Sequence, residues 1–235
     1  MSLRTTEPRP HPQTPPAVRR FQVRFARGIG LDEALNVQLA AVDRLRRDPE
    51  GDGLLLIVEH TPMVTLGRGG STSNVLASAQ ELAAAGVAFH RVRRGGDVTY
   101  HGPGQITLYP VYPLAWWSRS LRAAMRRLEA AGIAYLAGHG VQAGRAPGLT
   151  GVWVGEDKVA AIGIAVRHWI TYYGMAVNVA PDLDHFRLIR PCGIADRGVT
   201  SLARLTGREY NLDQEMRALA HAFARVHEGA RLRWL

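Results

Sequence analysis

The chain has 235 residues, 46% hydrophobic and 21% charged, a balance typical of a globular protein with an apolar core. Its one cysteine excludes an internal disulfide and favours a reducing, cytoplasmic compartment. No apolar run approaches the roughly 18 residues of a membrane span, so we expect no membrane association. The net charge of +9 favours an acidic partner, but the arginines are scattered and no nucleic-acid motif is present.

Residues 1–20 contain five prolines and few apolar side chains, which predicts a disordered tail. No linker-like stretch and no internal repeat interrupts residues 21–235. We therefore expect a Pro-rich tail followed by one catalytic domain over residues 21–235.

The first half of this domain begins with a helix over residues 31–48, where Leu31, Leu35, Leu39 and Val42 follow helical spacing. The apolar run 52–60 predicts a buried strand, and a second strand follows at 63–67 after a Thr-Pro turn. A short helix is expected at 79–86, closed by its glycine. Residues 87–114 are rich in strand-forming side chains and are broken by glycines and prolines.

The second half begins with a helix over residues 118–132, with a serine cap and a terminal glycine. Residues 150–180 predict an antiparallel meander with a hairpin turn at Glu156-Asp157. The final helix carries an apolar stripe formed by Met216, Leu219, Ala220, Phe223 and Val226. Strands grouped between separated helices predict an α+β fold rather than an alternating βαβ fold.

One lysine, Lys158, stands among 28 arginines in the set of 29 cationic side chains. Arginine stays protonated under ordinary conditions, whereas a lysine ammonium can release its proton. Lys158 is therefore a candidate for proton transfer, and the alternative is that codon bias removed every other lysine by chance.

The single thiol, Cys192, lies between Pro191 and Gly193, which disfavour a continuous helix or strand through it. A free cysteine is most often a small buried hydrophobe. Arg190 and Arg197 are close in sequence, and a positive environment favours the nucleophilic thiolate. Both interpretations of Cys192 stay open on these grounds.

The segment "RRGGDVTYHGPGQ" (93–105) is unusually rich in glycine, which lets a backbone approach a ligand closely. It matches neither the dinucleotide fingerprint nor a phosphate loop, so it predicts a ligand-contacting loop or, alternatively, a tight hairpin. His101 within it and His60 are ambiguous; without an HExxH or CxxC spacing, a hydrogen-bonding role is preferred to metal binding.

Three motifs in this order, "RGGDVTYHGPGQ" (94–105), "KVAAIGI" (158–164) and "PCGIADRGVTSL" (191–202), closely resemble those of the lipoyl (octanoyl) transferases. The segment 54–69 also resembles an early strand pair of that family. The resemblance implies the biotin/lipoate protein ligase-like α+β fold, a mixed sheet flanked by helices. It implies octanoyl transfer from octanoyl-acyl carrier protein to lipoyl domains of 2-oxoacid dehydrogenase complexes and the glycine cleavage H protein, with no cofactor and no metal.

By position, the resemblance implies that Cys192 carries an acyl thioester and that Lys158 activates it. The implied substrate-contacting residues fall in three stretches: Arg94, Gly95, Gly96, Asp97, Val98, Thr99, Tyr100 and His101; Ala161, Ile162 and Gly163; and Gly174, Met175 and Ala176. The family usually has histidine where this chain has Tyr173, and tyrosine cannot carry protons near neutral pH.

Two other functions remain as alternatives. An ATP-dependent lipoate or biotin protein ligase would share the fold and use a lysine, but would leave Cys192 without a role. A basic nucleic-acid binder without enzymatic activity would account for the charge alone.

Overall fold

The computed structural model describes residues 18–190 and 197–235, and these residues build two sheets and their covering helices. The larger sheet has eight strands in the order β11-β1-β2-β6-β10-β9-β8-β7. These strands are β1 (Arg20–Ile29), β2 (Gly53–His60), β6 (Gln105–Val111), β7 (Gly144–Ala146), β8 (Leu149–Val154), β9 (Asp157–Arg167), β10 (Ile170–Asn178) and β11 (Arg231–Trp234).

The sheet is mixed, as expected for the predicted α+β class. β1 runs parallel to both β2 and β11, whereas β2, β6, β10, β9, β8 and β7 are joined by antiparallel pairs. The helix α1 (Leu31–Arg47) connects β1 to β2, because parallel neighbours need a long crossover. The meander predicted for residues 150–180 is confirmed as β8-β9-β10.

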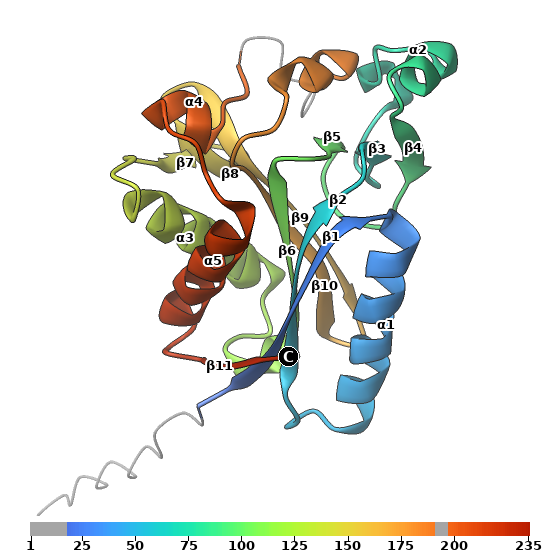
Figure 1. Ribbon diagram of the computed structural model, residues 1–235. Coiled ribbons are helices and arrows are strands. Elements are labelled where there is room, and N and C mark those ends of the chain that lie inside the picture. Colours follow the sequence, from blue (N-terminus) through green and yellow to red (C-terminus); the bar gives the residue numbers. More distant parts are fainter. Residues whose placement is uncertain (1–17, 191–196) are drawn as a thin grey trace, which may run out of the picture.

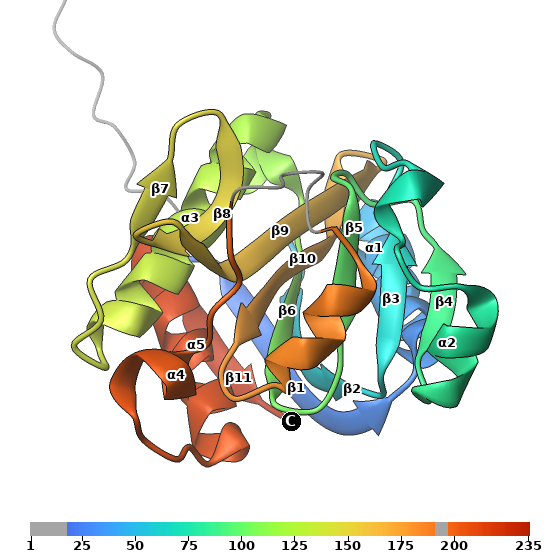
Figure 2. The ribbon, with the colours of Figure 1, turned by 90° about the horizontal axis from the view of Figure 1, so that it is seen from above.

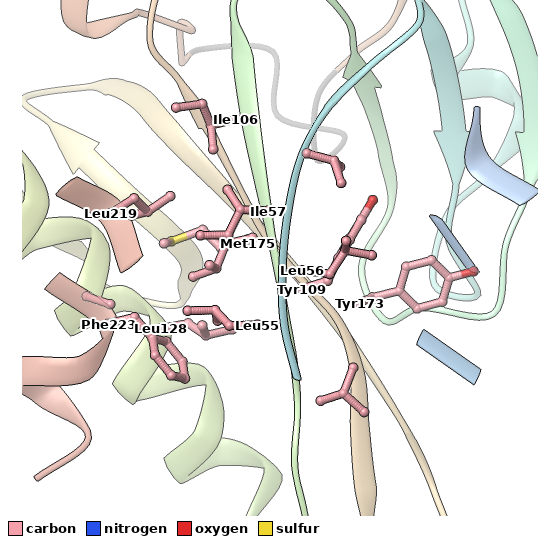
Figure 3. Close-up of a cluster of buried hydrophobic side chains, with 14 of the residues drawn as sticks. Leu55, Leu56, Ile57, Ile106, Tyr109, Leu128, Tyr173, Met175, Leu219 and Phe223 are labelled. Carbon is pink, nitrogen blue, oxygen red and sulfur yellow. The ribbon is translucent and has the colours of Figure 1, made fainter. Parts of the chain in front are cut away.

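Helices cover both faces of this sheet (Figure 1). α1 packs on one face, and α3 (Leu121–Ala137) and α5 (Leu212–Val226) pack together on the other. Figure 3 shows Leu55, Ile57 and Met175 directed toward the α3–α5 side, whereas Tyr109 and Tyr173 lie on the opposite side. The period of two in strands produces this division, and both faces are buried.

A smaller sheet has the order β4-β3-β5 and lies beside the large one (Figure 2). Its strands are β3 (Met63–Leu66), β4 (Ala88–Arg91) and β5 (Val98–His101). With α2 (Ala79–Ala84) and the 3-10 segment Leu183–Leu188 it encloses a second apolar core. The segment 54–69, which resembles an early strand pair of the family, forms β2 and β3. These two strands belong to different sheets and do not pair with each other.

The remaining elements are short: 3-10 turns at Thr72–Asn74 and Leu114–Trp116, and the helix α4 (Leu202–Thr206). None of the helices in residues 18–190 and 197–235 is long and apolar enough to cross a bilayer. Of the predicted N-terminal tail, residues 1–17 lie outside the described residues, and β1 begins at Arg20.

Two local predictions were wrong in detail. Helix α3 continues through Gly132 to Ala137, because Gly132 lies against β8 and β10; an added Cβ would come 2.8 Å from Val152 Cγ2. The hairpin turn lies at Gly155-Glu156, since Val154 pairs with Asp157. Gly155 takes the positive φ of 57° that this turn needs. On α1, Ala34 and Gln38 are more deeply buried than Leu35 and Leu39.

Candidate functional site

A cavity of about 340 Å³ lies between the large sheet and the glycine-rich segment before β5, within the size range of ligand pockets. Most of the sequence-predicted site residues line it. The cavity is lined by Leu31, Thr65, Gly69, Arg94, Gly96, Asp97, Val98, Thr99, His101, Thr107, Tyr109, Gly148, Leu149, Thr150, Lys158, Ala161, Ile162, Gly163, Tyr173, Gly174, Met175 and Ala176.

One wall consists of two stretches predicted separately from the sequence. In the antiparallel pair β9–β10, Gly163 faces Gly174, and residues 161–162 face residues 175–176 in the same register. The two stretches are therefore cross-strand neighbours, and their shared position follows from the hairpin.

The glycine-rich loop is fixed by backbone contacts on two sides. Gly69 N–H donates to Gly96 O at 3.1 Å, and Gly95 N–H donates to Ile164 O on β9 at 2.9 Å. A Cβ on Gly163 would lie 2.9 Å from both Arg94 Cδ and Gly95 O. Glycine at 163 is thus required for the loop to lie against β9, rather than to widen the cavity.

Arg94 is the buried cation of this loop, with 7% of its surface exposed. Its guanidinium donates to Thr65 O and Thr65 Oγ1 at 2.8 Å each, and to Gly95 O at 3.0 Å. These hydrogen bonds offset the free-energy cost of removing the guanidinium charge from water. They fix Arg94 between β3 and the loop.

His101 and Tyr100 are adjacent in β5 and face opposite sides. His101 Nδ1 lies 2.8 Å from Gln105 Oε1, and burial lowers the pKa of His101 to about 3, so the ring is neutral. Tyr100 stacks on His185 at 4.9 Å and contacts Phe186 in the second core. Gly95 and Tyr100 are the two residues of the predicted stretch 94–101 that do not line the cavity.

A second buried histidine supports the cavity floor. His60 Nδ1 donates to Ile29 O at 2.9 Å, so Nε2 accepts from Tyr109 Oη at 2.8 Å. Burial lowers the pKa of His60 to about 4, which keeps it neutral. Tyr109 and Thr65 line the cavity but were not singled out from the sequence. Their signal was weak: Thr65 is a polar side chain between apolar residues of β3, and Tyr109 is one of several side chains with polar groups in β6.

Tyr173, which stands where the family resemblance implies a histidine, lines the cavity from β10. Its φ of 58° is rare for a residue with a side chain, and its N–H donates to the buried Gln38 Oε1 at 2.7 Å. Burial raises the pKa of Tyr173 above its ordinary value. The phenol therefore stays protonated and can donate a hydrogen bond, but it carries no proton between groups at neutral pH.

Lys158 lies on β9 with 6% of its surface exposed, and its side chain lines the cavity. Nζ lies 4.7 Å from the centroid of the Trp153 ring, within the range of a cation–π contact. Its backbone pairs with the segment 198–200: Lys158 N–H donates to Gly198 O, and Thr200 N–H donates to Lys158 O, both at 3.0 Å. The chain that follows Cys192 thus runs alongside Lys158.

Cys192 itself lies within residues 191–196, outside the described residues. On its N-terminal side, Arg190 N–H donates to Asn74 O at 2.7 Å, and Asn74 Nδ2 donates to Asp97 Oδ2 at 2.6 Å. Asp97 lines the cavity. The described residues on both sides of Cys192 are therefore hydrogen-bonded to residues of the cavity or to their direct partners.

The arrangement places an amine, polar backbone and apolar strand surface around one cavity. The small and apolar residues of β9 and β10 suit an acyl chain, and Lys158 suits proton exchange with a thiol or an amine. Acyl transfer fits this combination.

Comparison with known proteins agrees with the motifs. Residues 31–224 match the family model of the lipoyl protein ligase A/B catalytic domain. An octanoyltransferase of Solibacter usitatus is 45% identical over 83% of this chain and 87% of its own length. An octanoyltransferase of Caldicellulosiruptor saccharolyticus is 40% identical over 92% of both chains.

Two solved structures share the fold at low sequence identity. A putative lipoate protein ligase of T. acidophilum with bound lipoic acid has a TM-score of 0.69 and 17% identity, over 92% of this chain and 88% of that one. A lipoate-protein ligase A bound with ATP has a TM-score of 0.67 and 18% identity, over 92% and 89%. The predicted biotin/lipoate protein ligase-like fold and the family resemblance are confirmed: this chain belongs to the lipoyl protein ligase A/B catalytic-domain family, among its octanoyltransferases.

Proposed function

We propose that this protein transfers an octanoyl group from octanoyl-acyl carrier protein to a lysine of a lipoyl domain. Cys192 carries the octanoyl group as a thioester between two half-reactions, and Lys158 exchanges protons with the thiol and amine groups. The relatives named octanoyltransferase, 40–45% identical to this chain, support this reaction.

The observation that carries the proposal is the position of Lys158. The only lysine of the chain is buried at the cavity, and its own backbone N–H and C=O are hydrogen-bonded to Gly198 O and Thr200 N–H, in the segment that follows Cys192. On the other side, Cys192 is two residues from Arg190, a span of at most about 7 Å. Arg190 is in turn joined through Asn74 to Asp97, which lines the cavity, and this short connection supports a reaction between the thiol and a substrate in the cavity.

In the first half-reaction, Lys158 accepts the Cys192 proton and the thiolate attacks the carbonyl carbon of the octanoyl thioester. The new C–S bond forms while the bond to the phosphopantetheine sulfur breaks. The leaving thiolate takes the proton back from the Lys158 ammonium. The products are octanoyl-Cys192 and the carrier protein with a free thiol.

In the second half-reaction, the neutral amine of the acceptor lysine attacks octanoyl-Cys192. A C–N bond forms and the C–S bond to Cys192 breaks, while Lys158 accepts the proton lost by the attacking nitrogen and returns it to Cys192. Backbone N–H groups at the cavity stabilise the oxyanion in both steps. No ATP is consumed, because the donor thioester is already activated.

The partners follow from this chemistry and from the charge. A net charge of +9 suits an acidic carrier protein as donor. The acceptors are lipoyl domains, in the 2-oxoacid dehydrogenase complexes and the glycine cleavage H protein, as the family resemblance implies.

The test is acylation of a purified apo lipoyl domain, followed by mass spectrometry. We expect octanoylation with octanoyl-acyl carrier protein in the absence of ATP, and none with the Cys192→Ser variant. Acylation that occurs only with free octanoate and ATP, accompanied by pyrophosphate exchange, would overturn the proposal in favour of a ligase.

A further inference from the structure

We propose that Gln105 and Asn178 are positioning residues, which hold the segment 198–200 in register with Lys158 through a buried chain of hydrogen bonds from His101. The inference rests on the proposed octanoyl transfer, in which the relative position of Lys158 and the Cys192-bearing chain determines proton exchange. Neither amide lines the cavity, so each acts through its neighbours.

The chain of hydrogen bonds is centred on two paired strands. Gln105 of β6 and Asn178 of β10 are cross-strand partners in the large sheet, and both are buried. Gln105 Nε2 donates to Asn178 Oδ1 at 2.9 Å and to Tyr100 O at 3.1 Å. Both amide protons of Gln105 are thus used, and its Oε1 accepts from His101 Nδ1 at 2.8 Å.

The direction of these bonds is determined by backbone groups at the ends. Asn178 Nδ2 donates to Thr200 O at 3.0 Å, and a carbonyl oxygen accepts only. Turning the Asn178 amide around would place two nitrogens together at Gln105 and two oxygens together at Thr200. One arrangement therefore satisfies the whole chain, which is the condition under which a buried polar network specifies a unique geometry.

His101 completes this chain on the cavity side. With Nδ1 donating to Gln105, its Nε2 is an acceptor and lies 3.4 Å from Thr65 Oγ1, which itself accepts from Arg94. Burial, with smaller contributions from His60 and Arg94, lowers the pKa of His101 to about 3. The ring therefore keeps one protonation state across the neutral range, and His101 is a fixed link between the glycine loop and Gln105.

At its far end, this chain of hydrogen bonds reaches the backbone of Lys158. Thr200, which Asn178 holds by its carbonyl, donates its N–H to Lys158 O at 3.0 Å, and Gly198 O accepts from Lys158 N–H. A slip of this segment by one residue would displace it by about 3.3 Å along β9. Such a displacement exceeds the tolerance of proton transfer, where a misplacement of about 1 Å can cost about 10²-fold in rate.

The test compares Asn178→Leu and Asn178→Asp with Thr171→Val. Asn178→Leu removes both hydrogen bonds at similar volume, and Asn178→Asp keeps the acceptor for Gln105 but loses the donor to Thr200. Thr171 is a matched control: it is buried on the same strand, donates to Pro110 O at 2.8 Å, and does not line the cavity.

Two readouts separate positioning from loss of fold. The first is the pH dependence of iodoacetamide alkylation of the single thiol; the second is kcat and KM for octanoyl transfer, with thermal unfolding as the check on folding. For folded Asn178 variants we expect the alkylation profile to move to higher pH and kcat to fall about 10–10²-fold at nearly constant KM. Thr171→Val should keep the wild-type profile and kcat.

Folded Asn178 variants with the wild-type alkylation profile and kcat would overturn the inference, as would Thr171→Val changing both readouts equally. If the wild-type protein transferred no octanoyl group at all, the proposed function would fail. The alkylation arm would still report whether Asn178 sets the environment of the thiol. The two failures are therefore distinguishable.

Discussion

Replacement of Lys158 by arginine separates the two ways in which a lysine can help a thiol. Lys158→Arg keeps a positive charge beside the cavity, but a guanidinium cannot exchange protons in proteins. If Lys158 acts only as a charge, the variant should keep a reactive thiolate and most of its activity. If Lys158 moves protons, thiolate formation should survive while transfer collapses.

The structure sets the expected size of the effect. The Lys158 stem lies against Gly151, where an added Cβ would be 3.3 Å from Cε, and Nζ lies over Trp153 at 4.7 Å. The larger guanidinium must enter this packed space, at a stability cost of about 1–3 kcal/mol. Loss of positioned proton transfer costs about 10²–10⁴-fold in rate, or about 2.7–5.4 kcal/mol in activation free energy.

The assay pairs alkylation of Cys192 as a function of pH with octanoyl transfer to a lipoyl domain, for Lys158→Arg and Lys158→Met. Methionine has a stem of similar length and no charge, so it should lose both thiolate stabilisation and transfer. We expect the arginine variant to keep an alkylation profile close to wild type while its transfer rate falls at least 10²-fold. Transfer by Lys158→Arg within about threefold of wild type would refute the proton-exchange role.

Two further predictions concern the fold around the site. Gly163→Ala would place a Cβ 2.9 Å from Gly95 O and from Arg94 Cδ, so we expect it to lower the free energy of unfolding by about 1–3 kcal/mol. At Gly144 an added Cβ meets no atom within 4 Å, so Gly144→Ala should change this free energy by less than about 0.5 kcal/mol. Equal urea-denaturation midpoints for the two variants would contradict this prediction. Burial lowers the pKa values of three histidines, His60, His101 and His227, to about 4, 3 and 4, so below pH 6.5 the unfolded chain binds more protons than the folded one. The free energy of unfolding should therefore fall as the pH drops from about 6.5 towards 4, by up to about 1.4 kcal/mol per pH unit for each histidine. A urea midpoint that stays constant between pH 7 and 5 would show that this linkage is absent.

Local patterns predicted much of the fold. The helical spacing of residues 31–48 and of the last helix, and the apolar run of β2, correspond to α1, α5 and a fully buried strand. No element was predicted over β1, although Phe21, Val23 and Phe25 alternate there with polar residues. The assignment of strands to two sheets depends on long-range pairing, which the sequence of each strand does not specify.

At the site too, the sequence did not specify how individual residues are placed. The motif segments 94–101, 161–163 and 174–176 were selected by resemblance, and the structure brings most of them to one cavity. Period two explains why Tyr100 faces away while His101 faces inward, but it does not reveal which face is the site. Gln105 and Asn178, 73 residues apart, interact only because β6 and β10 are neighbours in the sheet.

The most direct measurement of a thioester on Cys192 is the intact mass of the protein after incubation with octanoyl-acyl carrier protein alone. With a single cysteine in the chain, we expect one octanoyl adduct, removed by neutral hydroxylamine as a thioester and absent from Cys192→Ser. An adduct of equal yield in Cys192→Ser, or an unmodified wild-type protein that still octanoylates a lipoyl domain, would contradict a thioester on Cys192.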